Sequence, residues 1–249
     1  FSDLELVKNI GFGFIKTSKY NPKTISRFLP LFQFALLIFF IPKKKWKIKN
    51  VDTIILSSMS LFPIIGCLYL KRKLKAKQLI FEVRDFWPLT PIELMGISKY
   101  NPLILLMTFL EGLAFRYSDK IISLPPKGEE YIIGINKNFK KKIYHLPNGI
   151  EPQPFKQEKK INFNPREIKI IYAGTIGFAN ALEEYIRFIE QDNELTRLFK
   201  FEFLGDGYLK KTYEKRIGKF NNVNFAGRVE KNKVSEYLNE CDFGIICWH

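Results

Sequence analysis

The chain has 249 residues, of which 46% are hydrophobic and 15% aromatic, a composition typical of a folded protein with room for two medium-sized domains. The formal net charge of +15 suits an anionic membrane surface; the lysines are spread along the chain without a recognisable nucleic-acid-binding module, so no nucleic-acid partner is expected. Two histidines and three cysteines exclude a disulfide scaffold and a Cys/His zinc site at the usual spacings.

The first part of the chain contains an apolar block next to a cluster of lysines. We expect a strand over residues 11–17 and a helix over 22–41. The apolar block from Phe28 to Ile41 is too short to span a bilayer, which takes about 20 residues. Lysines and Trp46 follow it over residues 43–47, and this combination suits an interfacial contact with a membrane. A core helix followed by a solvated loop is the alternative.

Strands and helices alternate from residue 52 onward. Strands are expected over residues 52–56, 77–83, 120–124 and 142–146, and helices over residues 61–75, 102–117 and 126–133. Such alternation predicts βαβ units and a parallel sheet. Turn residues and a lysine-rich polar segment follow over residues 148–167, which we interpret as a linker between a domain of residues 1–147 and a domain of residues 168–249.

The second domain repeats the alternation and adds glycine-containing turns. Strands are expected over residues 168–173, 201–204, 223–225 and 243–247, and helices over residues 181–190, 208–218 and 231–239. The turns follow the first three strands, at the carboxyl ends where open α/β sheets bind ligands. Gly174 and Gly177 allow positive φ and close backbone approach, so this turn and the next helix could offer N–H groups to a phosphate. A turn that needs glycine only for packing is the alternative.

Five stretches in chain order resemble one family. FEVRDFWP (81–88) is similar to the EVRDLWP stretch of bacterial sugar transferases that build O-antigen and capsule chains, and LPNGI (146–150) is similar to the segment that opens their interdomain linker. The strand ends IYAGTIG (171–177), LGDG (204–207) and NFAGRV (224–229) resemble those of their donor domain. The family is glycosyltransferase family 4, and the nearest subgroup resembles the N-acetylfucosamine transferase-like enzymes.

The resemblance implies an α/β protein of the GT-B fold, with two Rossmann-like parallel-sheet domains that face each other across a cleft. It implies transfer of a sugar, with retention, from a nucleotide-sugar such as a UDP-sugar to a polyprenyl-diphosphate-linked glycan. This reaction belongs to surface polysaccharide biosynthesis at the cytoplasmic face of the membrane and uses no metal and no cofactor. The family's first strand and its Glu-x7-Glu pair are absent from the sequence, so we expect both domains to be incomplete and the fragment to be inactive alone.

The same resemblance assigns residues to the donor. Backbone amides of Gly174, Thr175 and Gly177 are expected to cradle the diphosphate, and Arg228 is expected to meet the nucleotide or its phosphates. Val229 would offer its backbone to the base. Gly205 and Gly207, in the turn after the next strand, are expected in the same donor-binding region. For Arg228, a solvated charge on a turn is the alternative.

Arg84 and Asp85 are the expected catalytic residues of the first domain. They follow a buried strand, and by analogy with the family Asp85 would orient the acceptor or the reacting sugar while Arg84 steadies a phosphate. An ion pair of Arg84 with Asp85 or Glu82 that locks the loop is the alternative. Trp87 either forms the floor of an acceptor site or packs in the core.

Two other function classes remain open from the sequence. One is a GT-B sugar-nucleotide 2-epimerase, which uses the same two-domain architecture without an acceptor. The other is a non-catalytic basic module that binds membranes or nucleic acid, for which steeply salt-dependent binding would be the sign.

Overall fold

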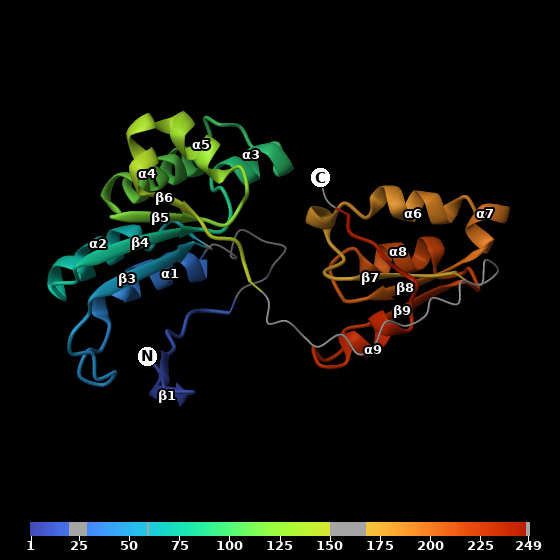
Figure 1. Ribbon diagram of the computed structural model, residues 1–249, viewed down its shortest axis with the longest axis horizontal. Coiled ribbons are helices and arrows are strands. Elements are labelled where there is room, and N and C mark those ends of the chain that lie inside the picture. The colour runs from blue at the N-terminus through green and yellow to red at the C-terminus, as the bar shows by residue number, and fades with distance from the viewer. Residues whose placement is uncertain (20–28, 59, 150–167, 248–249) are drawn as a thin grey trace. The chain divides into compact units, whose positions relative to one another are not determined.

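The structure is a computed structural model that describes residues 1–19, 29–58, 60–149 and 168–247. The chain divides into two compact units, Phe1–Pro152 and Gln153–His249 (Figure 1). The division falls within the expected linker 148–167, of which residues 150–167 lie outside the described residues. Each unit has a four-stranded parallel sheet and a hydrophobic core of its own.

The sheet of the first unit has the strand order β3-β4-β5-β6. Its elements are β3 (Thr53–Ser58), α2 (Ile64–Lys73), β4 (Gln78–Val83), α4 (Pro102–Tyr117), β5 (Lys120–Ser123), α5 (Gly128–Ile135) and β6 (Ile143–His145). Because each strand lies beside the one before it, right-handed crossovers place α2, α4 and α5 on the same face. In β4 the buried residues Leu79, Phe81 and Val83 alternate with partly exposed ones, so the core lies on one face of this sheet.

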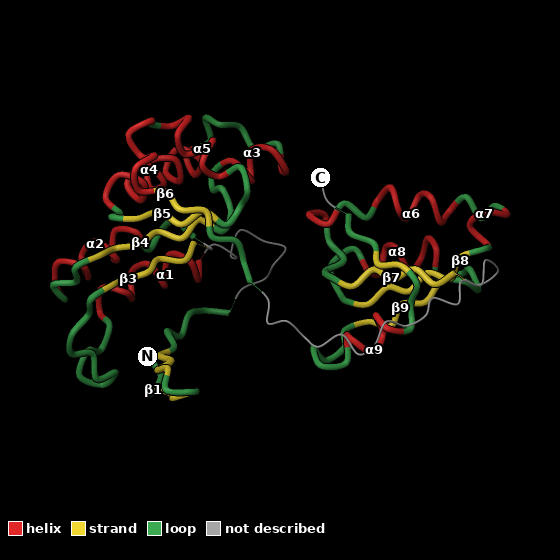
Figure 2. Tube along the Cα trace, in the orientation of Figure 1, coloured by secondary structure: helices red, strands yellow, loops and turns green. Residues whose placement is uncertain are grey.

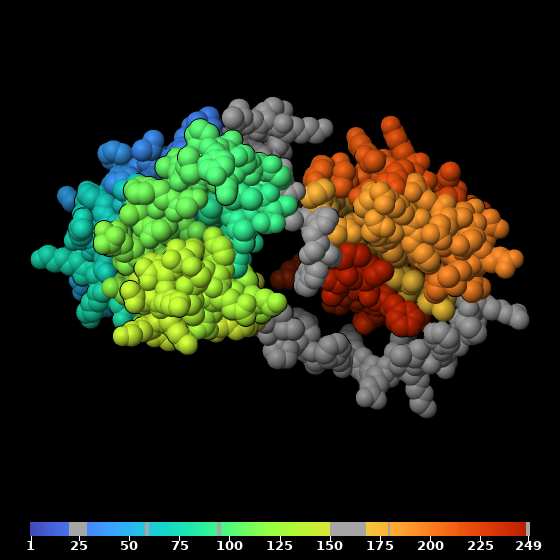
Figure 3. Space-filling model, turned by 90° about the horizontal axis from the view of Figure 1, so that it is seen from above, coloured from blue at the N-terminus to red at the C-terminus, as the bar shows by residue number. Residues whose placement is uncertain are grey.

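Helix α4 shows how the sequence specifies its own boundaries. The side chain of Asn101 accepts a hydrogen bond from the amide of Leu103, and Pro102 occupies the first helical position, where no N–H is needed. The helix ends before Ser118, and its buried residues recur at helical spacing. In the space-filling view, α3, α4 and α5 form one continuous surface in green to yellow-green (Figure 3). The bounds of α4 agree with those expected from the sequence, residues 102–117.

The N-terminal residues form a hairpin, which corrects the expected strand over residues 11–17. Strands β1 (Leu4–Val7) and β2 (Ile10–Gly13) pair antiparallel. The two residues between them, Lys8 and Asn9, both adopt positive φ, as the two-residue hairpin turn requires. Pairing with Leu4–Val7 fixes the strand at 10–13, and the apolar run alone does not show this pairing.

The helix expected over residues 22–41 is partly described. Residues 22–28 lie outside the described residues, and the rest forms α1 (Leu29–Leu37) followed by the 3-10 turn η2 (Ile38–Phe40). One side packs against α2, where Gly66 leaves no room for a Cβ beside Ile38, whereas Leu36 and Phe40 on the other side are exposed. In the described part of the chain, no helix is long and apolar enough to cross a membrane.

Four short elements were not expected from the sequence. Helix α3 (Leu89–Met95) begins after Pro88 and contains Pro91 in its first turn, where proline is tolerated. Gly96 ends the helix in the left-handed conformation with φ of 63°. The prolines therefore mark the start of a helix here and not a loop. The others are η3 (Lys137–Lys142), η4 (Phe178–Asn180) and α7 (Glu194–Arg197).

The sheet of the second unit has the strand order β10-β7-β8-β9. Its elements are β7 (Ile168–Ala173), α6 (Glu183–Glu190), β8 (Phe199–Leu204), α8 (Lys210–Ile217), β9 (Val223–Gly227), α9 (Val234–Asn239) and β10 (Phe243–Gly244). Helices α6 and α8 lie on one face of this sheet and α9 on the other, and Figure 2 shows the yellow strands between them. The chain passes from β9 back to β10 beside β7, so the strand order reverses there, a place where α/β sheets bind ligands.

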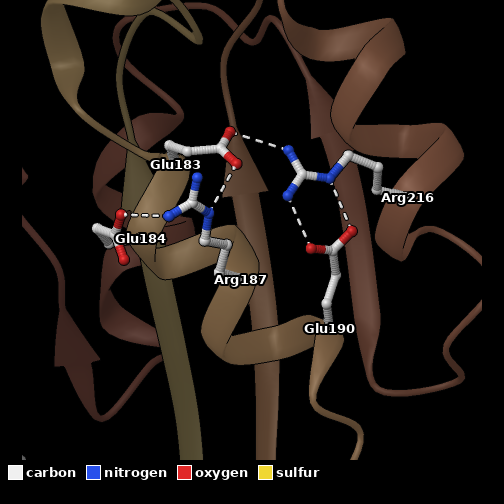
Figure 4. A network of polar contacts seen from close by, with 5 residues as sticks. All are labelled: Glu183, Glu184, Arg187, Glu190 and Arg216. Atoms are coloured by element: carbon white, nitrogen blue, oxygen red, sulfur yellow. Dashed lines mark hydrogen bonds and ion pairs between the residues drawn. The ribbon is translucent and has the colours of Figure 1, made fainter.

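A network of charged side chains joins α6 to α8 (Figure 4). The guanidinium of Arg216 on α8 donates two hydrogen bonds of 2.7 Å to the carboxylate of Glu190 and one of 2.9 Å to Glu183. Arg187, on α6 itself, contacts Glu183 and Glu184. The two helices that cover the core side of the sheet are therefore held together by charge as well as by apolar contacts.

Candidate donor site at the carboxyl ends of β7, β8 and β9

A pocket of about 470 Å³ lies at the carboxyl ends of three neighbouring strands in the second unit. It is lined by Ala173, Gly174, Thr175, Leu204, Gly205, Asp206, Arg228, Val229 and Val234. Five of the seven donor-binding residues expected from the sequence are thus in one pocket, namely Gly174, Thr175, Gly205, Arg228 and Val229. Gly177 and Gly207 belong to the same turns but do not line the pocket. The size is in the range of small-molecule sites.

Backbone hydrogen bonds join the three turns that form the pocket. The amide of Gly174 donates to the carbonyl oxygen of Leu204 at 2.9 Å, and the amide of Gly205 donates to Gly227 at 2.8 Å. The amide of Ile176 donates to the carbonyl oxygen of Asp206 at 3.0 Å. The hydrogen bonding between neighbouring strands therefore continues past the strand ends and joins the turns that form the pocket.

These bonds use some of the amides that were expected to cradle a diphosphate. The amide of Gly174 is already used in the ladder, and the amide of Gly177 donates to the carbonyl oxygen of Thr175 at 3.1 Å. The amide of Gly207, in the neighbouring turn, donates to the Asp206 side chain at 2.8 Å. Helix α6 begins only at Glu183, with two acidic residues in its first turn, so its N-terminus does not offer the expected phosphate site after the glycine turn. The amides of Gly174 and Gly177 thus donate within the protein, and a donor-binding role of these two residues stays a prediction.

The expected backbone freedom lies at other glycines. Gly205 has φ of 143° and Gly227 has φ of 76°, whereas Gly174 and Gly177 do not adopt positive φ. A Cβ at Gly205 would overlap the carbonyl oxygen of Gly174, so the close approach of the two turns requires glycine there. The pattern of a strand followed by glycine predicts where the turns lie but does not show which glycine must adopt positive φ.

Two tyrosines support the turn at residues 174–178, and neither was singled out from the sequence. The buried Tyr172 donates a 2.8 Å hydrogen bond from its hydroxyl to the carbonyl oxygen of Thr175. The hydroxyl of Tyr208 accepts a 2.8 Å hydrogen bond from the amide of Phe178. A tyrosine one residue before the strand end was the available signal for the first contact; the second joins residues 30 positions apart and has no local signal.

The positive charge at this site comes from two residues. Arg228 lies on the pocket wall directly after Gly227. Lys210, the first residue of α8, is 3.4 Å (Nζ) from the place that a Cβ at Gly227 would occupy, and it forms an ion pair of 3.4 Å with Glu214. Lys210 was not expected from the sequence, although a lysine in the first turn after Gly-Asp-Gly was a usable signal. Two cations beside an open pocket suit an anionic ligand.

Arg84 and Asp85 lie in the first unit, at the carboxyl end of β4, and both are exposed. The next residues are packed: Phe86 and Trp87 lie against the core of this unit. The indole Nε1 of Trp87 is buried and has no hydrogen-bond partner among the residues that the structure describes. This placement supports the core-packing interpretation of Trp87 over the acceptor-floor interpretation.

No protein-family model matches the sequence, and no curated protein matches it. Solved structures do. WaaG, a glycosyltransferase involved in lipopolysaccharide biosynthesis, matches with a TM-score of 0.57 at 13% identity over 79% of this chain. A variant of TarM from S. aureus, in complex with fondaparinux, alpha-GlcNAc-glycerol and UDP, matches with a TM-score of 0.56 at 12% identity over 86% of this chain. The chain has the GT-B fold.

The lipopolysaccharide outer core galactosyltransferase WaaB is also similar, with a TM-score of 0.50 at 13% identity over 87% of this chain. The chain spans 61% of the length of WaaG, 40% of TarM and 55% of WaaB. Among the described residues of this GT-B chain, no group of three or more His, Cys, Asp or Glu side chains is arranged to hold a metal ion.

Proposed function

We propose that this chain is part of a retaining glycosyltransferase that moves a sugar from a nucleotide-sugar, such as a UDP-sugar, to a lipid-linked glycan in surface polysaccharide biosynthesis. The observation that carries the proposal is the pocket at the carboxyl ends of β7, β8 and β9, which collects Gly174, Gly205 and Arg228 in a GT-B chain. The match to TarM, whose structure contains UDP, supports a nucleotide donor.

The diphosphate of the donor would be bound by side-chain cations more than by backbone amides. Because the amides of Gly174 and Gly177 donate within the protein, Arg228 is the group on the pocket wall that is suited to the negative charge. Lys210 lies beside the same turn and adds a second cation. In this proposal the glycines supply space, since side chains at these positions would fill the pocket wall.

Asp85 and Arg84 would act on the acceptor side of the reaction. Both are exposed and directly follow a buried strand. In the proposed reaction Asp85 orients the acceptor or the reacting sugar and Arg84 steadies a phosphate. No metal or cofactor takes part in the proposed reaction.

The acceptor is proposed to be a polyprenyl-diphosphate-linked glycan at the cytoplasmic face of the membrane. Exposed apolar side chains at Leu36 and Phe40 lie a few residues before the lysines of 43–47. Apolar groups beside lysines favour a peripheral contact with anionic lipid. Co-sedimentation with phosphatidylglycerol vesicles but not with phosphatidylcholine vesicles would support this contact.

Donor binding is the direct test of the proposal. We expect UDP to bind the chain in isothermal titration calorimetry, and Arg228→Ala to weaken this binding by about tenfold or more, because a charge-assisted contact is lost. Lys231→Ala, which removes an exposed charge three residues further on, is the matched control and should bind UDP like the wild type. Equal UDP affinity of Arg228→Ala and wild type would contradict the proposed site.

The alternatives give different results with the same protein. A 2-epimerase would convert a UDP-sugar to its epimer without an acceptor, which NMR of the sugar detects. A non-catalytic basic module would bind nucleic acid or vesicles with a steep salt dependence and would not bind UDP.

A further inference from the structure

A buried carboxyl group interrupts the apolar face of α4. Glu111 is 3% exposed and lies at helical spacing from the buried Met107, Ala114 and Phe115. A carboxyl group is costly to bury unless it has a hydrogen-bond partner. Burial raises the pKa of Glu111 to about 8, so the group is mostly neutral at neutral pH and can donate as well as accept. The site therefore holds a specific polar contact within an apolar layer.

The partner of this carboxyl group is Tyr131 on α5. The Tyr131 hydroxyl lies 2.9 Å from Oε2 of Glu111, and the tyrosine ring packs against Phe86 with centroids 4.5 Å apart and planes at 50°. Gly128, one turn earlier on α5, lies so close that its Cβ would be 3.0 Å from the Phe86 ring and would overlap the Ser123 hydroxyl. Phe86 is therefore enclosed by one end of α5.

Phe86 directly follows Arg84 and Asp85. Before this pair, Val83 is 1% exposed and its carbonyl oxygen accepts a 3.1 Å hydrogen bond from the amide of Leu124. After it, the carbonyl oxygen of Phe86 accepts a 2.7 Å hydrogen bond from the amide of Thr90. The exposed pair is thus fixed at one end by the sheet and at the other end by the Phe86 ring.

We propose that Glu111 and Tyr131 are positioning residues for the Arg84–Asp85 turn. Their hydrogen bond fixes the Tyr131 ring, and that ring fixes Phe86, which determines the direction in which Asp85 leaves the end of β4. The role in transfer rests on the proposed function, whereas the positioning itself is a property of the fold. Neither side chain contacts a substrate in this proposal.

The positioning can be measured without activity, because Trp87 adjoins Phe86. The chain contains three tryptophans, and 5-fluorotryptophan labelling gives each a ¹⁹F NMR signal that Trp87→Phe assigns. We expect Tyr131→Phe and Glu111→Leu each to shift or broaden the Trp87 signal while the Trp46 signal stays in place. Glu111→Gln should leave the Trp87 signal at its wild-type position, since its amide can still bond to the Tyr131 hydroxyl. Tyr144→Phe, at an exposed tyrosine of β6, is the matched control.

Transfer assays separate this inference from the proposed function. If the wild type transfers sugar, Tyr131→Phe should lower kcat by about tenfold, the effect of one buried hydrogen bond, and leave the donor KM within about twofold. Failure of the wild-type chain to bind UDP would contradict the proposed function, and the ¹⁹F result would still decide the positioning. If circular dichroism shows that Glu111→Leu and Tyr131→Phe are folded and their Trp87 signals are unchanged, the positioning role of Glu111 and Tyr131 is contradicted.

Discussion

The hydroxyl group of Tyr172 donates a 2.8 Å hydrogen bond to the carbonyl oxygen of Thr175, three residues further along the chain. Tyr172 is 4% exposed, so this bond joins the wall of the pocket at the strand ends to the hydrophobic core of the second unit. A Cβ at Gly174 would be 2.8 Å from the same hydroxyl, so glycine leaves room for the tyrosine. The conformation of this turn therefore depends on Tyr172, a residue of the hydrophobic core.

Tyr172→Phe should loosen this turn. Loss of one hydrogen bond costs about 1 kcal/mol, so we expect lower stability and UDP affinity weaker by about fivefold. Tyr185→Phe is the matched control, since the buried Tyr185 hydroxyl has no hydrogen-bond partner in the described part of the chain. Its removal should leave UDP affinity unchanged and leave the melting temperature equal or higher. Calorimetry and thermal unfolding measure both, and equal behaviour of the two variants would contradict the role of Tyr172.

Gly205→Ala tests the close approach of two turns. At Gly205, φ is 143° and a Cβ would overlap the carbonyl oxygen of Gly174, so alanine must push the turns apart. We expect a loss of stability of about 1–3 kcal/mol and no detectable UDP binding. Gly244→Ala is the control, because a Cβ there meets no atom within 4 Å. If Gly205→Ala unfolds at the same urea concentration as the wild type, the two turns can move apart without a loss of stability, which would contradict this prediction.

Much of the fold was predictable because its signals are local. The alternation of apolar strands and helices gave α4 (Pro102–Tyr117) and β7 (Ile168–Ala173) with their observed bounds. The β1–β2 hairpin was missed because its register depends on pairing between segments, and α3, a short helix of Leu89–Met95 that contains Pro91 in its first turn, was not expected. Periodicity reports on burial within one segment, not on its pairing partner.

The residues that line the pocket at the ends of β7, β8 and β9 could be placed together from the sequence, but the hydrogen bonds of their amides could not. Strand ends converge at one edge of a parallel sheet, so Gly174, Gly205 and Arg228 could be placed together from the sequence. Which amides remain available depends on hydrogen bonds between the turns, such as that from Gly174 to Leu204, and no local pattern shows these. Glu111 had a visible signal, an acidic residue within the apolar face of a helix, but its partner lies on another helix.

The ion pairs of Arg216 should stabilise the second unit in a pH-dependent way. Arg216 lowers the pKa of both Glu183 and Glu190 through hydrogen bonds and charge. Because these pKa values are depressed on folding, the stabilisation is present above the ordinary carboxyl value near 4.5 and is lost as pH falls through the folded values. Arg216→Gln should therefore lower the melting temperature at neutral pH and have less effect in acid or at high salt.

Arg187→Gln is the matched control for this network. Arg187 contacts Glu183 and Glu184 within the same helix, and its side chain is 61% exposed, so its ion pairs are screened by water. We expect a smaller change in melting temperature than for Arg216→Gln. Equal changes for the two variants would show that joining α6 to α8 adds nothing beyond a surface ion pair.

Glu111 gives a pH dependence of the opposite sign in the first unit. Burial raises its pKa from 4.5 to about 8, so between these values the folded protein holds a proton that the unfolded chain has released. The free energy of unfolding should then fall as pH rises, by at most about 1.4 kcal/mol per pH unit. The stabilisation is complete below the unfolded value and is lost as pH rises through the folded value.

Glu111→Gln removes this dependence, because the amide has no proton to lose and keeps a bond to Tyr131. Urea unfolding from about pH 5 to about pH 8 should therefore give a stability advantage of the variant that grows with pH. Glu93→Gln, which alters an exposed carboxyl group of α3, should follow the wild type across the same range. Parallel pH curves for wild type and Glu111→Gln would mean that Glu111 is already ionised in the folded protein. The hydrogen bond to Tyr131 would then join a charged acceptor to a neutral donor, and Glu111→Gln would no longer reproduce the native contact.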